Sequence, residues 1–266
     1  MALQRSTLQQ QLRELKRASA SLISELQTGL KQREGETVQL QARYSRQMCF
    51  SDSTNNTVKG YLSEWSRKDG VIIRPVWKWI REEAVNVTLD PDTAASWLDL
   101  SADGKEVKYI EIPKRVPDHH KRFDHAVCVL AKEGYCFGKF YYEVQVGEKT
   151  DWTLGVAKES VNRKGKITLS PKNGYWTVGL WNGTEYRALT DPSVPLLLRE
   201  KPRTVGVYVD YEGGQVSFYN VEARSHIYSF FGYFSSARIY PFFYPGFSKG
   251  GKNAAPLVIS PVSHTD

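Results

Sequence analysis

The sequence predicts an all-β fold, a two-sheet antiparallel β-sandwich that follows an N-terminal α-helical segment. The clearest sign lies in residues 204–220, where apolar residues alternate with others on both sides of a turn. This period of two marks strands with one buried face. The turn carries Gly213 and Gly214, and glycine takes positive φ without a Cβ clash. Many short strands, few helices and no repeat of fixed period favour a sandwich over a propeller.

Short apolar runs of this kind, separated by turn residues, continue through the rest of the chain. The expected strands are 107–112, 126–131, 138–146, 152–158, 175–181, 185–189, 204–211, 215–219, 226–231, 238–243 and 256–260. Within 138–146, apolar or aromatic residues at even positions alternate with Tyr141, Glu143 and Gln145. This pattern again predicts a strand with one buried face.

The first 46 residues differ in composition from the rest. The chain has 266 residues, of which 12% are aromatic, and Tyr44 is the single aromatic residue before Phe50. Leu8, Leu12, Leu15, Leu22 and Leu26 fit a heptad pattern. Residues 1–46 are therefore predicted to form a helical coiled coil that makes the chain a homodimer. A single amphipathic helix packed on its own domain is the alternative.

Charge is concentrated in the same segment. Residues 1–46 carry eight Lys or Arg and four Glu, which accounts for +4 of the formal net charge of +7. Because the rest of the chain is close to neutral, the overall basic charge does not predict nucleic-acid binding. RNA binding through the basic helix is kept as an alternative hypothesis.

Residues 47–84 are predicted to be a linker that ends in a short helix. The turn-rich run 51–57 has few apolar residues, whereas 76–84 has helical character. Trp77 and Ile80 are expected to hold this helix against the following domain, which covers residues 85–266.

Three cysteines, Cys49, Cys128 and Cys136, do not form a disulfide framework and suit a reducing compartment. No apolar run approaches the roughly 20 residues of a membrane-spanning helix, and Met1 is not followed by a signal-peptide pattern. We therefore expect a cytoplasmic protein without a membrane span.

Several motifs occur in order along the domain. They are Leu89-Asp90-Pro91, the run Gly138 to Val144 with Tyr141-Tyr142-Glu143-Val144, the run Trp152 to Ala157, Val209-Asp210-Tyr211-Glu212, and Tyr244-Pro245-Gly246-Phe247. Together they resemble the PRY–SPRY domain of tripartite-motif proteins and butyrophilins, whose hallmarks are LDP, WEVE and LDYE. The second and third hallmarks depart modestly from that pattern. The resemblance covers residues 85–262, about two thirds of the chain.

The resemblance implies a curved, concanavalin-like sandwich of two antiparallel sheets, with a PRY portion at 85–137 and a SPRY portion at 138–262. Members bind protein targets through variable loops, and tripartite-motif members carry the domain after a coiled coil. Their ubiquitin-ligase activity requires a RING with eight zinc ligands, which this sequence lacks. The expected function is therefore non-enzymatic recognition of a protein target, in the ubiquitin-ligase or innate-immune setting of the family.

Aromatic and basic residues in two loop regions form the expected partner site. Exposed aromatic residues and arginine anchor interfaces because they bury a large area at low entropic cost. By analogy with the family, the loops around 181–187 and 244–249 lie near one another, and Trp176 faces away from Trp181. The candidate residues are Trp181, Asn182, Tyr186, Arg187, Tyr244 and Phe247, with Arg163 and Lys164 of a basic loop that also holds Lys166. Core positions for Trp181 and Phe247, and simple solvation of the basic loop, are the alternatives.

No catalytic, metal or cofactor site is expected. Asp90 and Pro91 should set a turn, and Glu143 and Asp210 should bond loops or pair with arginine rather than act as a hydrolytic pair. His119, His120 and His125, with Asp118 and Asp124, form a metal-like cluster in sequence. Adjacent histidines in an extended loop do not readily point in one direction, which favours a solvated loop.

A butyrophilin-type sensor of a small anionic ligand is the alternative that the resemblance raises. Arg187 matches a basic position of the pyrophosphate pocket that some butyrophilins carry. Ala126, Thr153 and Ser193 stand where those members have His, His and Arg. These departures count against this ligand class.

Overall fold

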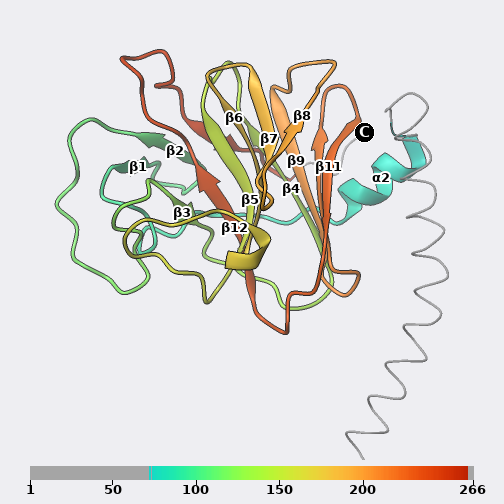
Figure 1. The fold of residues 1–266 in the computed structure, drawn as a ribbon, viewed down its shortest axis with the longest axis horizontal. Coiled ribbons are helices and arrows are strands. Elements are labelled where there is room, and N and C mark those ends of the chain that lie inside the picture. The colour runs from blue at the N-terminus through green and yellow to red at the C-terminus, as the bar shows by residue number, and fades with distance from the viewer. Residues whose placement is uncertain (1–71, 73, 263–266) are drawn as a thin grey trace, which may run out of the picture. The chain divides into compact units, whose positions relative to one another are not determined.

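The computed structural model describes residue 72 and residues 74–262. Residues 1–46 and their expected coiled coil and dimer lie outside the described residues. The described part is a sandwich of two antiparallel sheets with one helix on an outer face (Figure 1). The all-β fold class predicted from the sequence is confirmed.

The larger sheet has seven strands in the order β1-β2-β13-β4-β9-β10-β11. Their bounds are β1 Leu98–Leu100, β2 Glu106–Tyr109, β13 Leu257–Ile259, β4 Lys139–Gln145, β9 Thr204–Asp210, β10 Gln215–Asn220 and β11 Ser225–Phe231. The smaller sheet has six strands in the order β3-β12-β5-β6-β7-β8. Their bounds are β3 Val129–Leu130, β12 Ile239–Tyr244, β5 Trp152–Lys158, β6 Tyr175–Trp181, β7 Glu185–Ala188 and β8 Val194–Leu196, with a 3₁₀ turn η1 at Pro171–Asn173 before β6.

The core lies between the inner faces of the two sheets. Tyr142 of β4 contacts Phe243 of β12 with ring centroids 5.9 Å apart, and its hydroxyl donates to the Gly155 carbonyl at 2.6 Å. Phe243 pairs with Leu154, which pairs with Val178, so these residues share the inner face. All of them are buried, and a buried tyrosine whose hydroxyl has a partner stabilises the sandwich.

The hairpin predicted in residues 204–220 is present as β9 and β10. Asp210 pairs with Gln215 across the turn, and its Oδ1 accepts a hydrogen bond from the Gly213 N–H at 2.7 Å. Gly214 has φ +59°, and a Cβ there would lie 2.0 Å from the Gly232 carbonyl oxygen. Glycine is therefore required at this position for its conformation and for the close backbone approach.

All eleven expected strands are present, with ends that shift by a few residues. The sequence analysis missed β1 and β8, which have three residues each. Both are outermost strands of their sheets, and β8 contains Pro195, which cannot donate a ladder hydrogen bond. Length alone does not explain the two misses, because β3 and β13 are as short and lie within the predicted runs 126–131 and 256–260.

The short helix predicted before the domain is α2, Arg74–Glu82. Trp77 and Ile80 are buried, as expected, and Trp77 contacts the rings of Tyr141 and Tyr219 at 6.2 and 5.8 Å in edge-on geometry. Tyr141, on the polar side of the β4 alternation, is therefore buried under the helix. The helix covers an outward face of the seven-stranded sheet.

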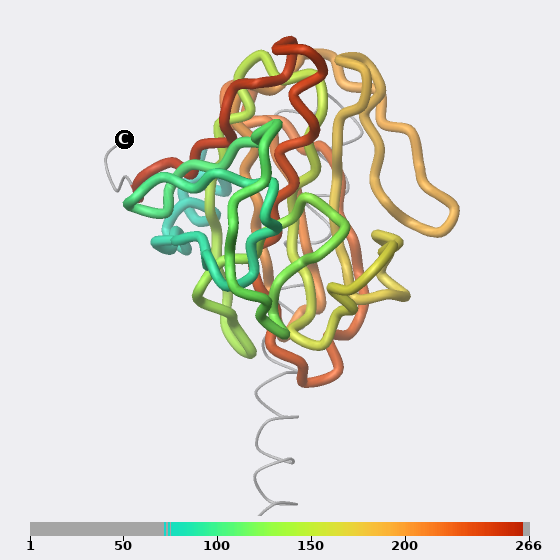
Figure 2. Tube along the Cα trace, turned by 90° about the vertical axis from the view of Figure 1, so that its left-hand side faces the viewer, coloured from blue at the N-terminus to red at the C-terminus, as the bar shows by residue number. Residues whose placement is uncertain are grey.

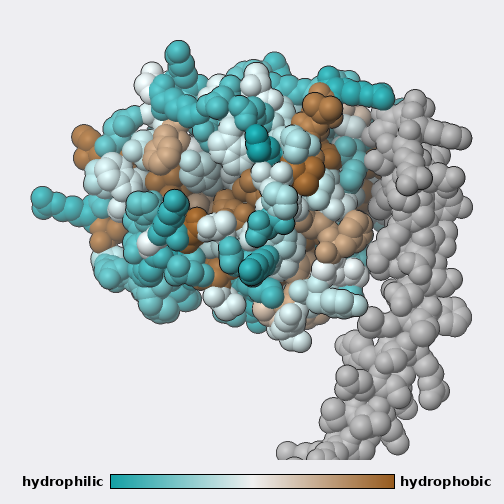
Figure 3. All heavy atoms as spheres, viewed as in Figure 1, coloured by the Kyte–Doolittle hydropathy of each residue, from teal (hydrophilic) through white to brown (hydrophobic). Residues whose placement is uncertain are grey.

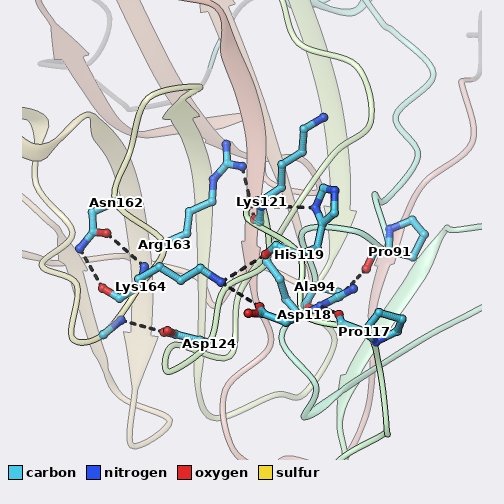
Figure 4. A network of polar contacts seen from close by, with 12 residues as sticks. Pro91, Ala94, Pro117, Asp118, His119, Lys121, Asp124, Asn162, Arg163 and Lys164 are labelled. Atoms are coloured by element: carbon cyan, nitrogen blue, oxygen red, sulfur yellow. Dashed lines mark hydrogen bonds and ion pairs between the residues drawn. The ribbon is translucent and has the colours of Figure 1, made fainter.

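The PRY motif forms the predicted turn. The Asp92 N–H donates to Asp90 Oδ1 at 3.0 Å, and the Thr93 N–H donates to the Asp90 carbonyl at 3.1 Å. Arg122 Nη1 donates to the carbonyls of Pro91 and Ala94, both at 2.7 Å (Figure 4). These bonds fix the loop that leads into the sandwich.

Candidate partner-binding face

One row of residues crosses the outer face of the six-stranded sheet. The register places Tyr244 of β12 opposite Thr153, and Thr153 opposite Gly179. Gly179 is in turn opposite Arg187, which is opposite Pro195. Directly opposed residues share a face, so Tyr244 and Arg187 lie on the same side of the sheet.

Trp181 lies above the middle of this row. A Cβ on Gly179 would lie 2.7 Å from the Trp181 ring atom Cη2, so the indole covers the glycine. Trp181 is half-buried, whereas Trp176 is buried on the inner face, as expected from their odd spacing. Asn182 (φ +52°) and Gly183 (φ +76°) form the predicted tight turn after it.

The segment after β12 is held by one buried amide, Asn253. Its Oδ1 accepts from the N–H groups of Thr150 and Asp151 at 2.8 and 3.2 Å. Its Nδ2 donates to the carbonyls of Asp151, Pro245 and Phe247 at 3.0, 3.2 and 3.0 Å. With 2% of its surface exposed, Asn253 fixes the loop that carries Phe247.

Lys149 also forms hydrogen bonds with the segment that contains Asn253. Its buried ammonium donates to the carbonyls of Asn253 and Ala255 at 3.0 and 2.7 Å. Burial lowers the pKa of Lys149 from 10.5 to about 8. Burial, with the nearby charge of Asp151, raises the pKa of the Tyr244 hydroxyl.

Lys249 joins the two loop regions. Its ammonium pairs with Oδ2 of the buried Asp151 at 2.6 Å and donates to Asn182 Oδ1 at 3.5 Å. The 244–249 loop and the 181–187 turn are therefore neighbours, as the family analogy implied. We define the partner face as the surface built from Trp181, Asn182, Arg187, Tyr244 and Phe247.

An aromatic ladder extends the partner face. Phe247, 49% exposed, contacts the ring of Tyr244 at 6.4 Å and that of Tyr109 at 5.2 Å, both edge-on. Tyr109 stacks on Trp97 at 6.1 Å. Trp97 and Tyr109 were not predicted from the sequence, because they lie more than 130 residues before Phe247 and no local pattern links them.

Arg187 and Tyr186 point to opposite sides of β7. Arg187 Nη1 donates to Ser193 Oγ at 3.2 Å, and Nη2 lies 3.4 Å from Glu185 Oε2. Tyr186 is opposite Leu180 and contacts Trp152 at 6.3 Å on the inner side. The structure therefore places Tyr186 on the opposite face of β7 from Arg187.

Arg163 and Lys164 lie at the other end of β6 from Trp181. A seven-residue strand spans roughly 20 Å. In Figures 1 and 2 the segment after residue 244 lies at the top of the sandwich, and the yellow η1 region lies well below it. The structure therefore does not bring the basic loop to the partner face.

Both basic residues contact the PRY portion (Figure 4). Arg163 donates to the carbonyls of Glu159 and Lys121, and Lys164 pairs with Asp118 at 3.3 Å and bonds the His119 carbonyl. Burial lowers the pKa of the Arg163 guanidinium. These contacts hold the PRY and SPRY portions together.

The motif carboxylates have structural partners. Glu143 accepts from the Tyr141 hydroxyl at 2.9 Å and lies 3.6 Å from Arg81. Asp210 caps the β9–β10 turn and lies 3.8 Å from Lys139. Within residues 74–262, no cluster of His, Cys, Asp and Glu has the geometry of a metal site. Asp118 and Asp124 instead bond Lys164 and the Gly165 N–H.

On the side of the molecule seen in Figure 3, apolar side chains form separate patches among hydrophilic ones. Besides Phe247, the exposed large apolar residues include Phe137, Phe231 and Tyr233, which belong to other segments of the chain. Exposed single apolar residues are ordinary. Phe247 differs from these residues because its ring contacts Tyr109 and Tyr244 and its carbonyl accepts a hydrogen bond from Asn253.

A two-sheet antiparallel sandwich with a set of anchored loops at one end defines a β-sandwich binding module. Comparison with known families agrees: the SPRY domain profile matches residues 139–258, and the SPRY-associated (PRY) profile matches residues 87–135. The chain therefore belongs to the PRY–SPRY family of tripartite-motif proteins and butyrophilins, whose domains are protein-interaction modules.

Several curated proteins are similar to this chain. Human erythroid membrane-associated protein is 49% identical over 71% of this chain and 39% of its own length. Human pyrin is 49% identical over 76% of this chain and 26% of its own. Human zinc finger protein RFP is 45% identical over 69% of this chain and 36% of its own. The chain thus matches about a third of the length of these relatives.

Solved structures support the fold. The TRIM65 PSpry domain matches with a TM-score of 0.59 and 20% identity, over 71% of this chain and 98% of that one. Stonustoxin matches with a TM-score of 0.59 and 24% identity, over 67% and 29%. Within the described residues, no helix is long and apolar enough to cross a bilayer.

Proposed function

We propose that this protein recognises a protein target through the partner face and catalyses no reaction itself. The observation that carries the proposal is the junction of the two loops. Lys249 joins the Asn182 turn to the loop of Phe247, and Asn253 anchors that loop with five hydrogen bonds. Half-exposed aromatic side chains on an anchored loop suit binding, because little entropy is lost when they are covered.

The larger role follows from the family. We propose that the domain is the target-recognition part of a tripartite-motif-type ubiquitin-ligase or innate-immune protein that acts in the cytoplasm. A homodimer through residues 1–46 would present two partner faces and raise the avidity for a multivalent target. Any ligase activity would reside in a RING outside this sequence.

The butyrophilin-type alternative has less support. Arg187 is already bonded to Ser193 and faces Glu185. Thr153, at one of the positions where those butyrophilins carry histidine, is buried. RNA binding through the basic helix concerns residues outside the described part and predicts a steep loss of affinity with salt.

Proximity labelling in cells tests the proposal. Three forms are compared: the intact chain, a Trp181→Ala/Phe247→Ala variant, and a Trp79→Ala/Tyr233→Ala control. The control removes two exposed aromatic residues that lie away from the partner face. We expect one set of proteins to be labelled by the intact chain and the control and lost from the partner-face variant.

An identical set of labelled proteins from all three forms would contradict the proposal. Thermal melting of the purified variants distinguishes a loss of binding from a loss of folding stability. We expect the partner-face variant to melt within about 2–4 °C of the intact chain, as for a loss near 1 kcal/mol.

A further inference from the structure

A second surface lies at the end of the sandwich opposite the partner face. The loop between β5 and β6 surrounds a hollow of about 500 Å³, bordered by Lys158, Lys166 and Lys172 with Ser160, Thr168 and the buried Tyr175. This volume is in the range of binding sites for small groups of atoms. The hollow is distinct from the row of residues beneath Trp181.

The charge of this hollow is of one sign. Three lysines line it and no carboxylate does. Nearby acids are engaged elsewhere: Glu159 accepts from the Tyr240 hydroxyl, Asp118 pairs with Lys164, and Asp124 accepts from the Gly165 N–H. Like charges gathered at a concave surface raise the local positive potential and attract anions.

The three lysines make none of the ion pairs that several other cations of the domain make. Lys201 and Arg203 pair with Glu148, and Lys114 and Lys108 pair with Asp99. Within the described part of the chain, no ion pair joins Lys158, Lys166 or Lys172 to a carboxylate. Lys158 is instead held over the Trp176 ring at 5.8 Å.

The loop around the hollow is fixed by its own hydrogen bonds. The Asn162 side chain bonds the N–H and the carbonyl of Lys164, and Asn173 Nδ2 donates to the Thr168 carbonyl at 3.0 Å. The N–H groups of Asn173 and Gly174 donate to the carbonyls of Ser170 and Pro171. The lysines therefore extend from a loop whose backbone conformation is fixed by hydrogen bonds.

The groups that line the hollow favour carboxylates over phosphate as the bound anion. Phosphate sites typically use convergent backbone N–H groups or arginine forks. Here the N–H groups of Asn173 and Gly174 are bonded within the loop, and arginine does not line the hollow. Tyr175 is buried and offers no exposed ring on which a base could stack. Lysine ammoniums are point charges on flexible stems, so they can pair with several carboxylates of a peptide without a fixed geometry.

We propose that this hollow docks an acidic polypeptide segment with two or three closely spaced carboxylates. The site is separate from the partner face and is proposed to bind a segment of the same protein target. The binding is electrostatic and therefore weakens as salt is raised.

Fluorescence anisotropy with labelled hexaglutamate tests this assignment on the full chain. We expect saturable binding, no binding of hexaglutamine, and an affinity loss of about tenfold or more in Lys166→Glu/Lys172→Glu. Both lysines are exposed, so the variant should fold, and Lys166→Gln/Lys172→Gln should give a smaller loss in the same direction.

A matched control carries the same change in net charge elsewhere. Lys78→Glu/Lys132→Glu alters two exposed lysines outside the hollow and should change the affinity less than about twofold. Equal losses in both variants would overturn the site, because net charge alone would then explain binding. So would binding of inositol hexakisphosphate at the hollow without binding of hexaglutamate. Trp181→Ala/Phe247→Ala should leave hexaglutamate affinity unchanged, which keeps this test independent of the proposed function.

Discussion

At the scale of single residues, buried polar groups determine where the loops lie. Asn253 satisfies two N–H groups and three carbonyls that would otherwise be unpaired around 150–151 and 245–247. An unpaired buried polar group costs about 1–3 kcal/mol. The position of Phe247 therefore depends on a residue six positions away that need not touch the target.

Asn253→Ala should lower the free energy of unfolding by about 3 kcal/mol, because several buried groups lose their partner at once. Target capture should fall as well, since the loop of Phe247 is no longer held. Chemical denaturation measures the first effect, with the exposed Asn86→Ala as the control. Equal stability of the two variants would show that the amide network is not what holds the loop.

His226 gives the fold a dependence on pH. Its Nε2 lies 2.7 Å from Ser229 Oγ, and burial lowers its pKa from 6.5 to about 4. The unfolded chain therefore binds a proton between these values that the folded chain does not. Stability is full above pH 6.5 and falls as the pH drops toward 4, by up to about 1.4 kcal/mol per pH unit.

Denaturation of the intact chain and of His226→Gln at several pH values between 4 and 7 tests this dependence. The difference in unfolding free energy between the two forms should narrow as the pH falls, because the glutamine does not titrate. If the difference in unfolding free energy stayed constant across this pH range, protonation of His226 would not destabilise the folded chain.

At the scale of elements, α2 shows how a short helix is fixed by tertiary contact. Nine residues are too few for a stable isolated helix. Trp77 lies against Tyr141 and Tyr219, so the helix is stabilised by the sheet. Burial of Tyr141 illustrates a limit of sequence reasoning, because alternation along β4 assigns it to the polar face until a second element covers that face.

Trp77→Ala should cost about 3 kcal/mol of stability, as for other large aromatic residues removed from packed sites. Trp79 is on the same helix and 57% exposed, so Trp79→Ala should change stability by less than about 0.5 kcal/mol. Thermal melting of this matched pair measures the contribution of α2. Similar melting temperatures would mean that the helix does not stabilise the sandwich.

Strands with clear alternation of apolar and polar residues were predicted from the sequence. Features that depend on contacts between distant parts of the chain were not. The β9–β10 hairpin follows from its own residues and turn. By contrast, β1 and β8 were missed; both are edge strands, and β8 contains Pro195. For the site, the sequence predicted Trp181, Arg187, Tyr244 and Phe247, which share a face. The links through Trp97, Tyr109 and Asn253 arise from contacts that local sequence does not encode.

At the scale of the whole molecule, the sequence predicts two copies of one binding module. The leucine pattern of residues 1–46 predicts a dimer, with a mass in sedimentation equilibrium of twice the 30.3 kDa chain. Leu12→Lys/Leu22→Lys should give the single-chain mass, because charges at the seam oppose association. The same mass for both forms would contradict a dimer through this segment.

The measurement that tests the central claim most directly is the affinity of the purified chain for a captured target. Isothermal titration calorimetry compares the intact chain with Trp181→Ala, Phe247→Ala, the double variant and the Trp79→Ala/Tyr233→Ala control. We predict that each partner-face substitution weakens binding by about 2 kcal/mol, roughly thirtyfold in Kd, while the control binds as the intact chain does. Unchanged affinity in the double variant would contradict the partner face as the site of recognition.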